Sequence, residues 1–394
     1  MTELDRLLDF AARSRLPEGG FGYLLDDGSV DPARGQETWI VARMTHVFGL
    51  AHLLGRPGAA ELARHGVLAL TEGPLHDEEH GGWSASTADP TKAAYVHAFA
   101  VLAGATATTA GIEGGRPLLA EALGTWLGRF WDDDAGMAVE EWDAAWTTLS
   151  DYRGVNANMH GVEAVLAAAD ALDAVADDAV GAATELRAHA LRTTERVVHG
   201  WARERDWRLP EHYSTDWVPL PEYNRDRPAD PFRPYGVTVG HQFEWSRLAL
   251  HLRAALDDPP TWLLDDAIGL FEAAARRGWA ADAHDGFPYT LDWDDRPVVV
   301  ARMHWVLCEA VAAAAALAEV TGQDRYRRLA ERWRAHGEER FADPATGNWH
   351  HELTPTGEVG TGTWVGQPDA YHLAQMLLLD GRPVRGSLAA ALSR

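Results

Sequence analysis

The amino-acid sequence predicts an all-α fold, a single (α/α)6 barrel with short β-hairpin loops. Helical periodicity recurs about twelve times along the 394 residues. A weak internal repeat of roughly 55–65 residues joins these helices in pairs. No Pro/Gly/Ser-rich linker divides the chain. We therefore expect residues 1–394 to form one domain in which alternate helices lie inside the barrel.

The expected helices follow one another along the whole chain. They lie near residues 2–15, 36–54, 58–72, 90–110, 116–131, 155–173, 179–199, 238–256, 260–278, 297–321, 323–341 and 367–379. Four prolines stand near expected helix starts, where a missing N–H costs no hydrogen bond: Pro90, Pro117, Pro260 and Pro297. Strand-like pieces lie between some of the pairs, such as AGMAVEEW, FPYTLDW and NWHHEL.

Acidic turns follow several of the helices, in the segments HDEEHGGW, WDDDAGM, DAHDGFPY and ADPATGNW. Asp–Gly-type hairpin turns explain these clusters without a calcium site. The tetrapeptide VARM occurs at residues 41–44 and again at 300–303. We expect the two copies on two helices of the same alternate set.

Composition excludes several classes of function. The chain has 59 acidic and 35 basic residues, and its net charge of −24 disfavours nucleic acid and anionic membranes as partners. Lys92 is the only lysine, so Schiff-base chemistry and lysine-dependent phosphate loops lack a candidate residue. No GxxxxGKS/T segment and no GxGxxG after a strand is present, and we expect no nucleotide cofactor. The single Cys308 excludes internal disulfides and a cysteine-based zinc site.

The N-terminal segment, the apolar runs and the single cysteine together point to the cytoplasm. The N-terminal segment is amphipathic and lacks the basic and apolar regions of a signal peptide. The longest apolar run, around 311–317, is too short to span a bilayer. The 17 tryptophans are consistent with an aromatic carbohydrate site, although most tryptophans in any protein are core residues.

A polar stripe marks the helix expected at 155–173. Asn156, His160 and Glu163 are spaced i, i+4 and i+7, so they share one face of the helix. The residues between them are apolar, and the helix is expected to be buried all round. Such a stripe favours a polar cavity over solvent, and a capped helix start with one core histidine is the alternative.

Similar polar groups stand in the N-terminal halves of the other expected inner helices. They are Trp39, Arg43 and His46; Tyr95 and His97; His241 and Glu244; Arg302, Trp305 and Glu309; and Asp369 and His372. If the inner helices run parallel, these side chains meet at one end of the barrel. Packing explains Tyr95 and His97 better than chemistry does, and a core histidine explains His46 equally well.

Two of these pairs place a carboxylate one helical turn from a histidine, His241 with Glu244 and His372 with Asp369. Such a carboxylate can set the tautomer and basicity of an acid–base histidine. HxxE occurs at 160–163 and 241–244, but di-iron bundles use the reverse order. We therefore expect no metal.

These segments resemble the N-acylglucosamine 2-epimerase superfamily of (α/α)6 barrels over almost the whole chain. The similarity is greatest to its aldose–ketose isomerase branch, which includes D-mannose isomerases and sulfoquinovose isomerases. The segments that carry it are TWIVARMTHVF, YRGVNANMHGVEA, FRPYGVTVGHQFEWSRL, ARMHWVLCEA and GQPDAYH. NANMH is the most specific of them.

The resemblance implies the site residues and the reaction. His241 and His372 would be catalytic, and the sugar pocket would be lined by Trp39, Arg43, Asn156, His160, Arg233, Glu244, Trp305 and Glu309. It implies a monosaccharide substrate, with D-mannose and D-fructose interconverted through an enediolate, and no metal or cofactor. D-Lyxose or sulfoquinovose as the substrate, and the formation of homo-oligomers, are left open.

In the expected mechanism, His372 carries the proton between C2 and C1 while His241, supported by Glu244, opens the pyranose ring. The two roles could be exchanged. Three alternatives remain open: a 2-epimerase acting on glucose and mannose or on an N-acylglucosamine, a glycoside hydrolase using Glu244 and Glu309, and a non-catalytic sugar-binding protein.

Overall fold

A computed structural model of the chain describes residues 2–175 and 180–393. The chain divides into two compact units. The first unit comprises Met1–Thr193, Pro368–Tyr371 and Arg385–Arg394, and the second comprises Thr194–Gln367 and His372–Val384. That residues 1–394 form a single domain stays a prediction.

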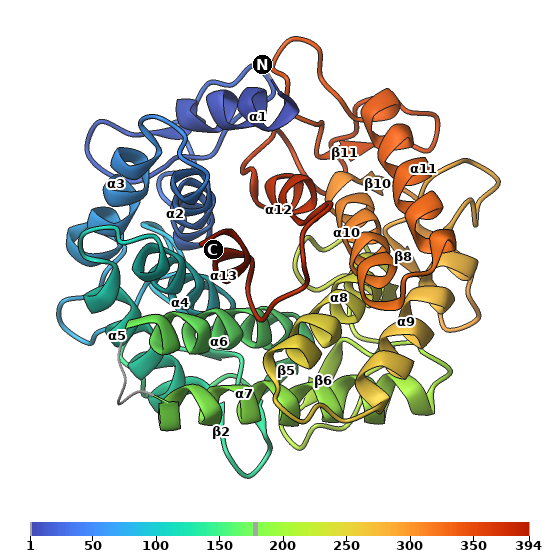
Figure 1. Ribbon diagram of the computed structural model, residues 1–394, viewed down its shortest axis with the longest axis horizontal. Helices are drawn as coiled ribbons and strands as arrows, with labels where there is room; N and C mark the ends of the chain where they lie inside the picture. The colour runs from blue at the N-terminus through green and yellow to red at the C-terminus, as the bar shows by residue number, and fades with distance from the viewer. Residues whose placement is uncertain (1, 176–179, 394) are drawn as a thin grey trace. The chain divides into compact units, whose positions relative to one another are not determined.

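The first unit is built from helical pairs. Its helices are α1 (Glu3–Ala11), α2 (Thr38–Leu53), α3 (Ala59–Glu72), α4 (Ala94–Thr109), α5 (Gly115–Thr125), α6 (Val155–Val175), α7 (Val180–Thr194) and the short α13 (Leu388–Leu392). α2 packs on α3 and α4, and α4 packs on α5 and α6 (Figure 1). Residue 179, the expected start of α7, lies outside the described residues.

The second unit repeats this arrangement. Its helices are α8 (Val239–Ala255), α9 (Trp262–Gly278), α10 (His304–Thr321), α11 (Asp324–Arg340) and, from its second residue on, α12 (Tyr371–Leu379). α8 packs on α9 and on α10, and α10 packs on α11 (Figure 1). One helix of each pair therefore lies beside the corresponding helix of the next pair.

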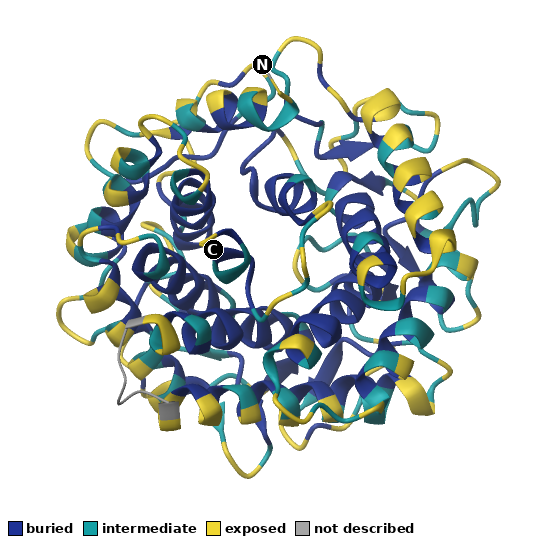
Figure 2. Cartoon of the chain, viewed as in Figure 1, coloured by how far each residue is buried: buried dark blue, intermediate teal, exposed yellow. Residues whose placement is uncertain are grey.

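Burial separates the two helices of each pair. Every residue of α2 from Thr38 to Ala51 is buried, and so is every residue of α8 from Val239 to Leu252. In α11 only Tyr326, Ala330, Trp333 and Gly337 are buried, which is one apolar stripe. Figure 2 shows the same contrast between α4 and α5 and between α10 and α11. The helices expected inside are thus the buried ones within each unit.

Short antiparallel strands join the helices. In the first unit β1 (Lys92–Ala93) pairs with β4 (Glu141–Trp142), and β2 (Trp131–Asp132) pairs with β3 (Met137–Ala138). In the second, β8 (Thr290–Leu291) lies between β7 (Val237–Thr238) and β9 (Pro297–Val299), and β10 (Arg302–Met303) pairs with β11 (Glu352–Leu353). β5 covers Tyr152–Gly154, and β6 covers His212–Ser214. The three strand-like segments of the sequence all contain one of these strands.

The acidic clusters form tight turns. The N–H of Gly81 donates to the Asp77 carbonyl, and the same turn occurs between Gly136 and Asp132. The Asp77 carboxylate also accepts the backbone N–H groups of Glu79 and His80 at 3.0 Å. These carboxylates cap their own loops, as the interpretation of the clusters as hairpin turns requires.

Three helices begin later than the sequence predicted. α4, α10 and α12 start at Ala94, His304 and Tyr371, and not near 90, 297 and 367. Before α4 and α10 the chain is extended because it pairs in β1, β9 and β10. Arg302 therefore lies in β10 and not on a helix, which corrects the expectation for the second VARM copy. Its guanidinium binds Asp282 at 2.6 Å. The sequence did not predict α13.

By length and composition alone, α10 could cross a membrane. Its 18-residue window has a mean hydropathy of 1.3, and 72% of that window is buried inside the protein. A core helix has the same properties. The burial of α10 against α8 and α11 fits that interpretation.

Candidate active site

His241 stands in the first turn of α8, directly after the extended residues of β7. Its Nδ1 lies 2.9 Å from both carboxylate oxygens of Glu211, a buried residue just before β6. A carboxylate only accepts hydrogen bonds, so Nδ1 carries the hydrogen and donates it. The other ring nitrogen, Nε2, is then left for chemistry. The expected partner Glu244 does not make this bond, because Glu211 occupies Nδ1.

His372 has the same kind of partner. Its Nδ1 lies 2.9 Å from Oε1 of Glu309, which comes from the first half of α10. The other carboxylate oxygen of Glu309 accepts from Nε of Arg247 at 2.8 Å. Burial alone would raise the pKa of Glu309, but Arg247 and His372 together lower it below its usual value. Glu309 is therefore an ionised acceptor for His372.

Glu244 is fully buried on α8, one turn after His241. Its carboxylate lies 3.6 Å from the guanidinium of Arg247. Ligand atoms of Glu244, Glu309 and His372 all lie within 4.8 Å of one another, so this set could hold a cation. Arg247 already supplies a positive charge to both carboxylates, and a metal ion there would be repelled by it. The donor set fits an ion-pair network better than a metal site.

Trp305 packs close to both histidines. Its ring centroid is 5.2 Å from that of His241 and 5.5 Å from that of His372. Both histidines are buried, and the carboxylate partner of each binds Nδ1. The structure thus brings His241, His372 and Trp305 together, as the sequence predicted, with an aromatic ring beside two acid–base groups.

Arg233 lies in the loop between β6 and β7, shortly before α8, as expected. Its backbone N–H donates to Asp230 at 2.9 Å, and its carbonyl accepts from the amide of Asn224 at 2.7 Å. The side chain is half-buried. These bonds fix the backbone from which the guanidinium extends.

Arg43 is the charged centre of the first unit's polar residues. Its guanidinium binds Asp369 at 3.1 Å and donates to the Tyr95 hydroxyl at 2.8 Å. It also stands over the rings of Phe99, at 4.3 Å, and Tyr371, at 4.6 Å. Burial works against the charge, but Tyr95 and Asp369 keep the pKa of Arg43 above its usual value.

The expectation that Asp369 serves His372 is therefore wrong: Arg43 takes that carboxylate. Trp39 lies beside the same arginine, with its ring centroid 5.1 Å from the guanidinium carbon. The indole N–H of Trp39 donates to Glu37 at 2.6 Å. The structure therefore brings together Trp39 and Arg43, the two candidates on α2.

The stripe on α6 is also buried. His160 Nδ1 lies 3.7 Å from the Glu163 carboxylate, which accepts a hydrogen bond from the Tyr371 hydroxyl. The His160 ring packs on Phe99 at 4.6 Å. Asn156 is half-buried, and its side-chain oxygen has no hydrogen-bond partner among the residues that the structure describes. A buried acceptor of this kind suits a hydroxyl donor of a ligand.

The surroundings of His97 and His46 are those of core histidines that stabilise the fold. His97 accepts the backbone N–H of Trp83 at 3.1 Å, and burial lowers the pKa of His97 to about 3. His46 Nδ1 is 2.7 Å from the Thr106 hydroxyl, and burial lowers the pKa of His46 to about 4. Both rings are therefore neutral at pH 7, which fits the packing interpretation.

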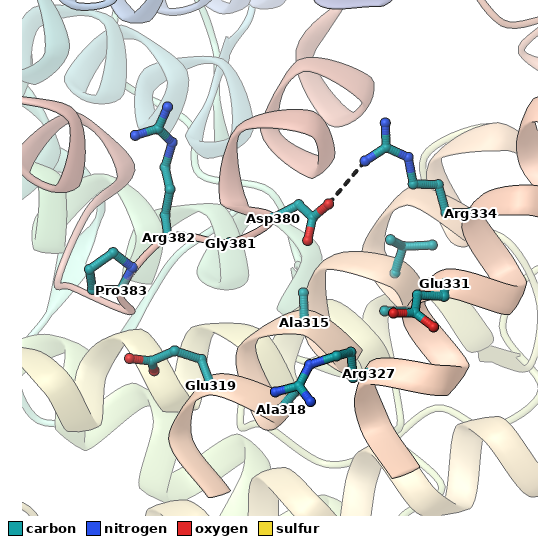
Figure 3. Close-up of a pocket in the computed structure, with 12 residues that line it drawn as sticks. Ala315, Ala318, Glu319, Arg327, Glu331, Arg334, Asp380, Gly381, Arg382 and Pro383 are labelled. Carbon is teal, nitrogen blue, oxygen red and sulfur yellow. Dashed lines mark hydrogen bonds and ion pairs between the residues drawn. The ribbon is translucent and has the colours of Figure 1, made fainter. Parts of the chain in front are cut away.

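A cavity of about 520 Å³ lies elsewhere in the second unit, between α10, α11 and the segment 380–383 (Figure 3). On α10 it is lined only by residues from Val311 onward, whereas Trp305 and Glu309 precede them. Arg334 and Asp380 pair across its rim at 3.0 Å (Figure 3). It contains none of the predicted site residues, and its charges include no histidine, so it is not the candidate active site.

Sequence reasoning missed Glu211, Arg247 and the role of Tyr371. Arg247 continues the spacing of His241 and Glu244 along α8, and a longer stripe would have included it. Tyr371 is the residue before His372. Glu211 gave no signal, because it lies in a non-helical segment 30 residues before its partner.

Comparisons with known proteins show the family of the chain. A family model described as N-acylglucosamine 2-epimerase matches residues 19–376. D-mannose isomerase of Thermobifida fusca is 50% identical over 398 residues, which cover 99% of this chain and 95% of that protein. D-mannose isomerase of Pseudomonas cannabina pv. alisalensis is 45% identical over 396 residues, covering 98% and 93%.

Solved structures give the fold. A crystal structure of D-mannose isomerase matches with a TM-score of 0.85 and 25% identity, covering 95% of this chain and 96% of that one. Cellobiose 2-epimerase from Spirochaeta thermophila matches with a TM-score of 0.79 and 22% identity, covering 98% and 94%. The match to the D-mannose isomerase structure confirms the predicted fold class, an all-α (α/α)6 barrel.

Proposed function

The chain belongs to the N-acylglucosamine 2-epimerase family, and from this premise we propose that it is an aldose–ketose isomerase that interconverts D-mannose and D-fructose. The close relatives named D-mannose isomerase support the choice of reaction and substrate. The observation that carries the chemistry is the pair of histidines next to Trp305, each held at Nδ1 by a buried glutamate.

Isomerisation moves one proton from C2 to C1 of the open-chain sugar. His372 Nε2 takes the proton as the C2–H bond breaks and the C1=C2 bond of the enediol forms. The same nitrogen then returns the proton to C1, and the C2=O2 carbonyl of the ketose forms. Glu309 keeps the Nδ1–H of His372 in place, so Nε2 has a lone pair when the aldose arrives. Such a positioned base contributes on the order of 10²–10⁴ in rate.

The oxygen proton must move in the same direction, from O2 to O1. We assign this transfer to His241, which first opens the pyranose: its Nε2 takes the O1 proton and passes it to the ring oxygen, so that the O1 carbonyl forms as the C1–O5 bond breaks. Hydrogen moves as a proton throughout and no electrons enter or leave the sugar. The reaction therefore balances without a redox cofactor.

The enediolate needs positive charge near O1 and O2. The family resemblance predicts Arg43 for this role, and within the first unit its guanidinium is buried and held in one orientation by Asp369 and Tyr95. Trp305 offers a flat apolar face for the C–H side of the sugar. Asn156, with its unsatisfied side-chain oxygen, is a predicted acceptor for a sugar hydroxyl.

Proton NMR of the EDTA-treated protein with D-mannose in D2O tests the proposal. Fructose as the first product is the expected result. Deuterium at C1 then reports how far the base exchanges with solvent. Glucose as the first product would replace the proposal by a 2-epimerase, and unchanged mannose would refute the choice of substrate and make sulfoquinovose the next sugar to test. The His372→Ala variant in the same assay is the control for a contaminating isomerase.

A further inference from the structure

We propose that Glu211 is the positioning residue of His241: it fixes the tautomer and the orientation of that ring, a role that the sequence pattern gives to Glu244. The inference rests on the proposed function for its catalytic consequence. Its structural content, which nitrogen of His241 carries the hydrogen, stands apart from any activity.

The contact is built as a positioning bond. Both oxygens of Glu211 lie 2.9 Å from Nδ1, and Glu211 and His241 are only 4% and 6% exposed. A carboxylate out of water needs a donor, and the imidazole N–H is the donor that this one has. Rotating the imidazole by half a turn would place the carbon Cδ2 at the carboxylate and lose the bond at Nδ1.

Glu244 is engaged elsewhere. Helical spacing places it one turn from His241, but its carboxylate faces Arg247 at 3.6 Å and joins the cluster with Glu309 and His372. Glu244 therefore contributes to the environment of His372 and not to that of His241. Local spacing therefore identified the wrong carboxylate, and the correct one comes from a distant loop.

The segment that carries Glu211 is fastened to α8 beside His241. The amide of Gln242, the residue after His241, donates to the carbonyl of Trp207 at 2.6 Å. On the other side of Glu211, His212 Nε2 bonds the carbonyl of Pro234 at 2.7 Å. One hydrogen bond before Glu211 and one after it thus fix its backbone. The carboxylate is therefore held in one orientation relative to the His241 ring.

The pair made by Glu309 and His372 supports the assignment by analogy of geometry. In both pairs a buried glutamate binds Nδ1 at 2.9 Å, so both histidines present Nε2. Both rings also pack close to the same residue, Trp305. Glu309 was predicted from its helix, and Glu211 is its counterpart for the other histidine.

A double-mutant cycle tests whether Glu211 acts through His241. Turnover of mannose and thermal unfolding are measured for Glu211→Ala, Glu211→Gln, His241→Ala and the double alanine variant. We expect Glu211→Ala to lower kcat by roughly 10–10². In the His241→Ala background it should lower kcat no further. Glu211→Gln should recover part of the rate, because its amide oxygen still accepts the Nδ1–H.

The matched control is Glu222→Gln, in the loop after β6, whose exposed side chain pairs with Arg225. It should leave kcat unchanged. Equal kcat in Glu211→Ala and the wild type, or a full additional loss in the His241→Ala background, would overturn the assignment. The second outcome would mean that Glu211 only supports the fold.

A readout without activity separates the two proposals. Long-range ¹H–¹⁵N NMR of histidine side chains, with His241 assigned by comparison with His241→Asn, shows which ring nitrogen carries the hydrogen. We expect Nδ1–H in the wild type and a shift toward Nε2–H in Glu211→Ala. If the wild type does not isomerise mannose but this shift occurs, the proposed function fails and the positioning role stands. An unchanged tautomer in Glu211→Ala would overturn the positioning role whatever the activity.

Discussion

Arg247 should be the most costly side chain to remove from the second unit's ion-pair network. It is fully buried, binds Glu309 at 2.8 Å and lies 3.6 Å from Glu244. Arg247→Met keeps much of the side chain's volume but removes its charge. Both buried carboxylates would then lose the cation that compensates them.

The magnitude follows from the distances. At an effective dielectric constant of about 20, unit charges 2.8 Å apart attract by roughly 6 kcal/mol. The variant is spared the cost of desolvating the guanidinium, which offsets part of that loss. Breaking one side of a buried pair typically costs about 3–5 kcal/mol. We expect a fall of that size in the free energy of unfolding at pH 7, measured by urea denaturation.

The loss should shrink as the pH falls. In the wild type the pKa of Glu309 is lowered, so its contribution is present above the unfolded pKa and is lost as pH falls through the folded pKa. Without Arg247 the pKa of Glu309 rises, because burial then dominates. Glu309 would take up a proton at a higher pH in the variant than in the wild type, and its penalty as a buried charge would then disappear. The gap between the wild type and the variant should therefore be smaller at pH 5 than at pH 7.

The control is Arg334→Met, because Arg334 pairs with Glu338 and Asp380 at the partly exposed surface of α11. Surface pairs contribute about 0–1 kcal/mol, so this variant should unfold nearly as the wild type does. An Arg247→Met variant as stable as this control, or a gap that widens toward pH 5, would refute the reasoning.

Three further predictions concern activity and loop order. His372→Ala should lower kcat by a factor on the order of 10² or more, and near-native turnover would remove His372 from the mechanism. Arg43→Lys should lower kcat/KM by about 10–10² and leave the circular dichroism spectrum unchanged. The reason is that an ammonium group cannot reproduce the planar guanidinium that Asp369 holds in place. Unchanged kinetics would contradict this prediction. Glu352 accepts three backbone N–H groups of residues 362–364 at 2.8 Å, so Glu352→Ala should make that loop sensitive to limited proteolysis, and cleavage at the wild-type rate would count against it.

The helices were predictable because they carry a local signal. The alternation of a helix that is apolar on nearly all sides with one that has a single apolar stripe can be read from the sequence, and α10 and α11 show the two patterns. Helix starts were harder to predict where strand pairing of the backbone competes with helix formation. Pro297 suits the first turn of a helix as well as an edge strand, and pairing with β8 decides for the strand.

The members of the site were also predictable, but their pairing was not. His241, Trp305, Glu309 and His372 stand on helices with a recognisable polar spacing. The carboxylates that bind the two histidines, however, lie 30 residues from His241 and 63 residues from His372 along the chain. Helical spacing in a sequence identifies only partners that lie one turn away on the same helix. It therefore suggested Glu244 and Asp369 as the carboxylate partners, and not the distant Glu211 and Glu309.

This error has a physical cause that bears on the mechanism. A histidine in the first turn of a helix can reach a carboxylate one turn later only by lying along its own helix. A carboxylate from another element can instead bind Nδ1 and leave the ring extended, with Nε2 at the far end. Both catalytic candidates use the second arrangement, His241 with Glu211 and His372 with Glu309. Each ring is thus held by an element other than its own, and its reactive nitrogen is aimed by tertiary structure.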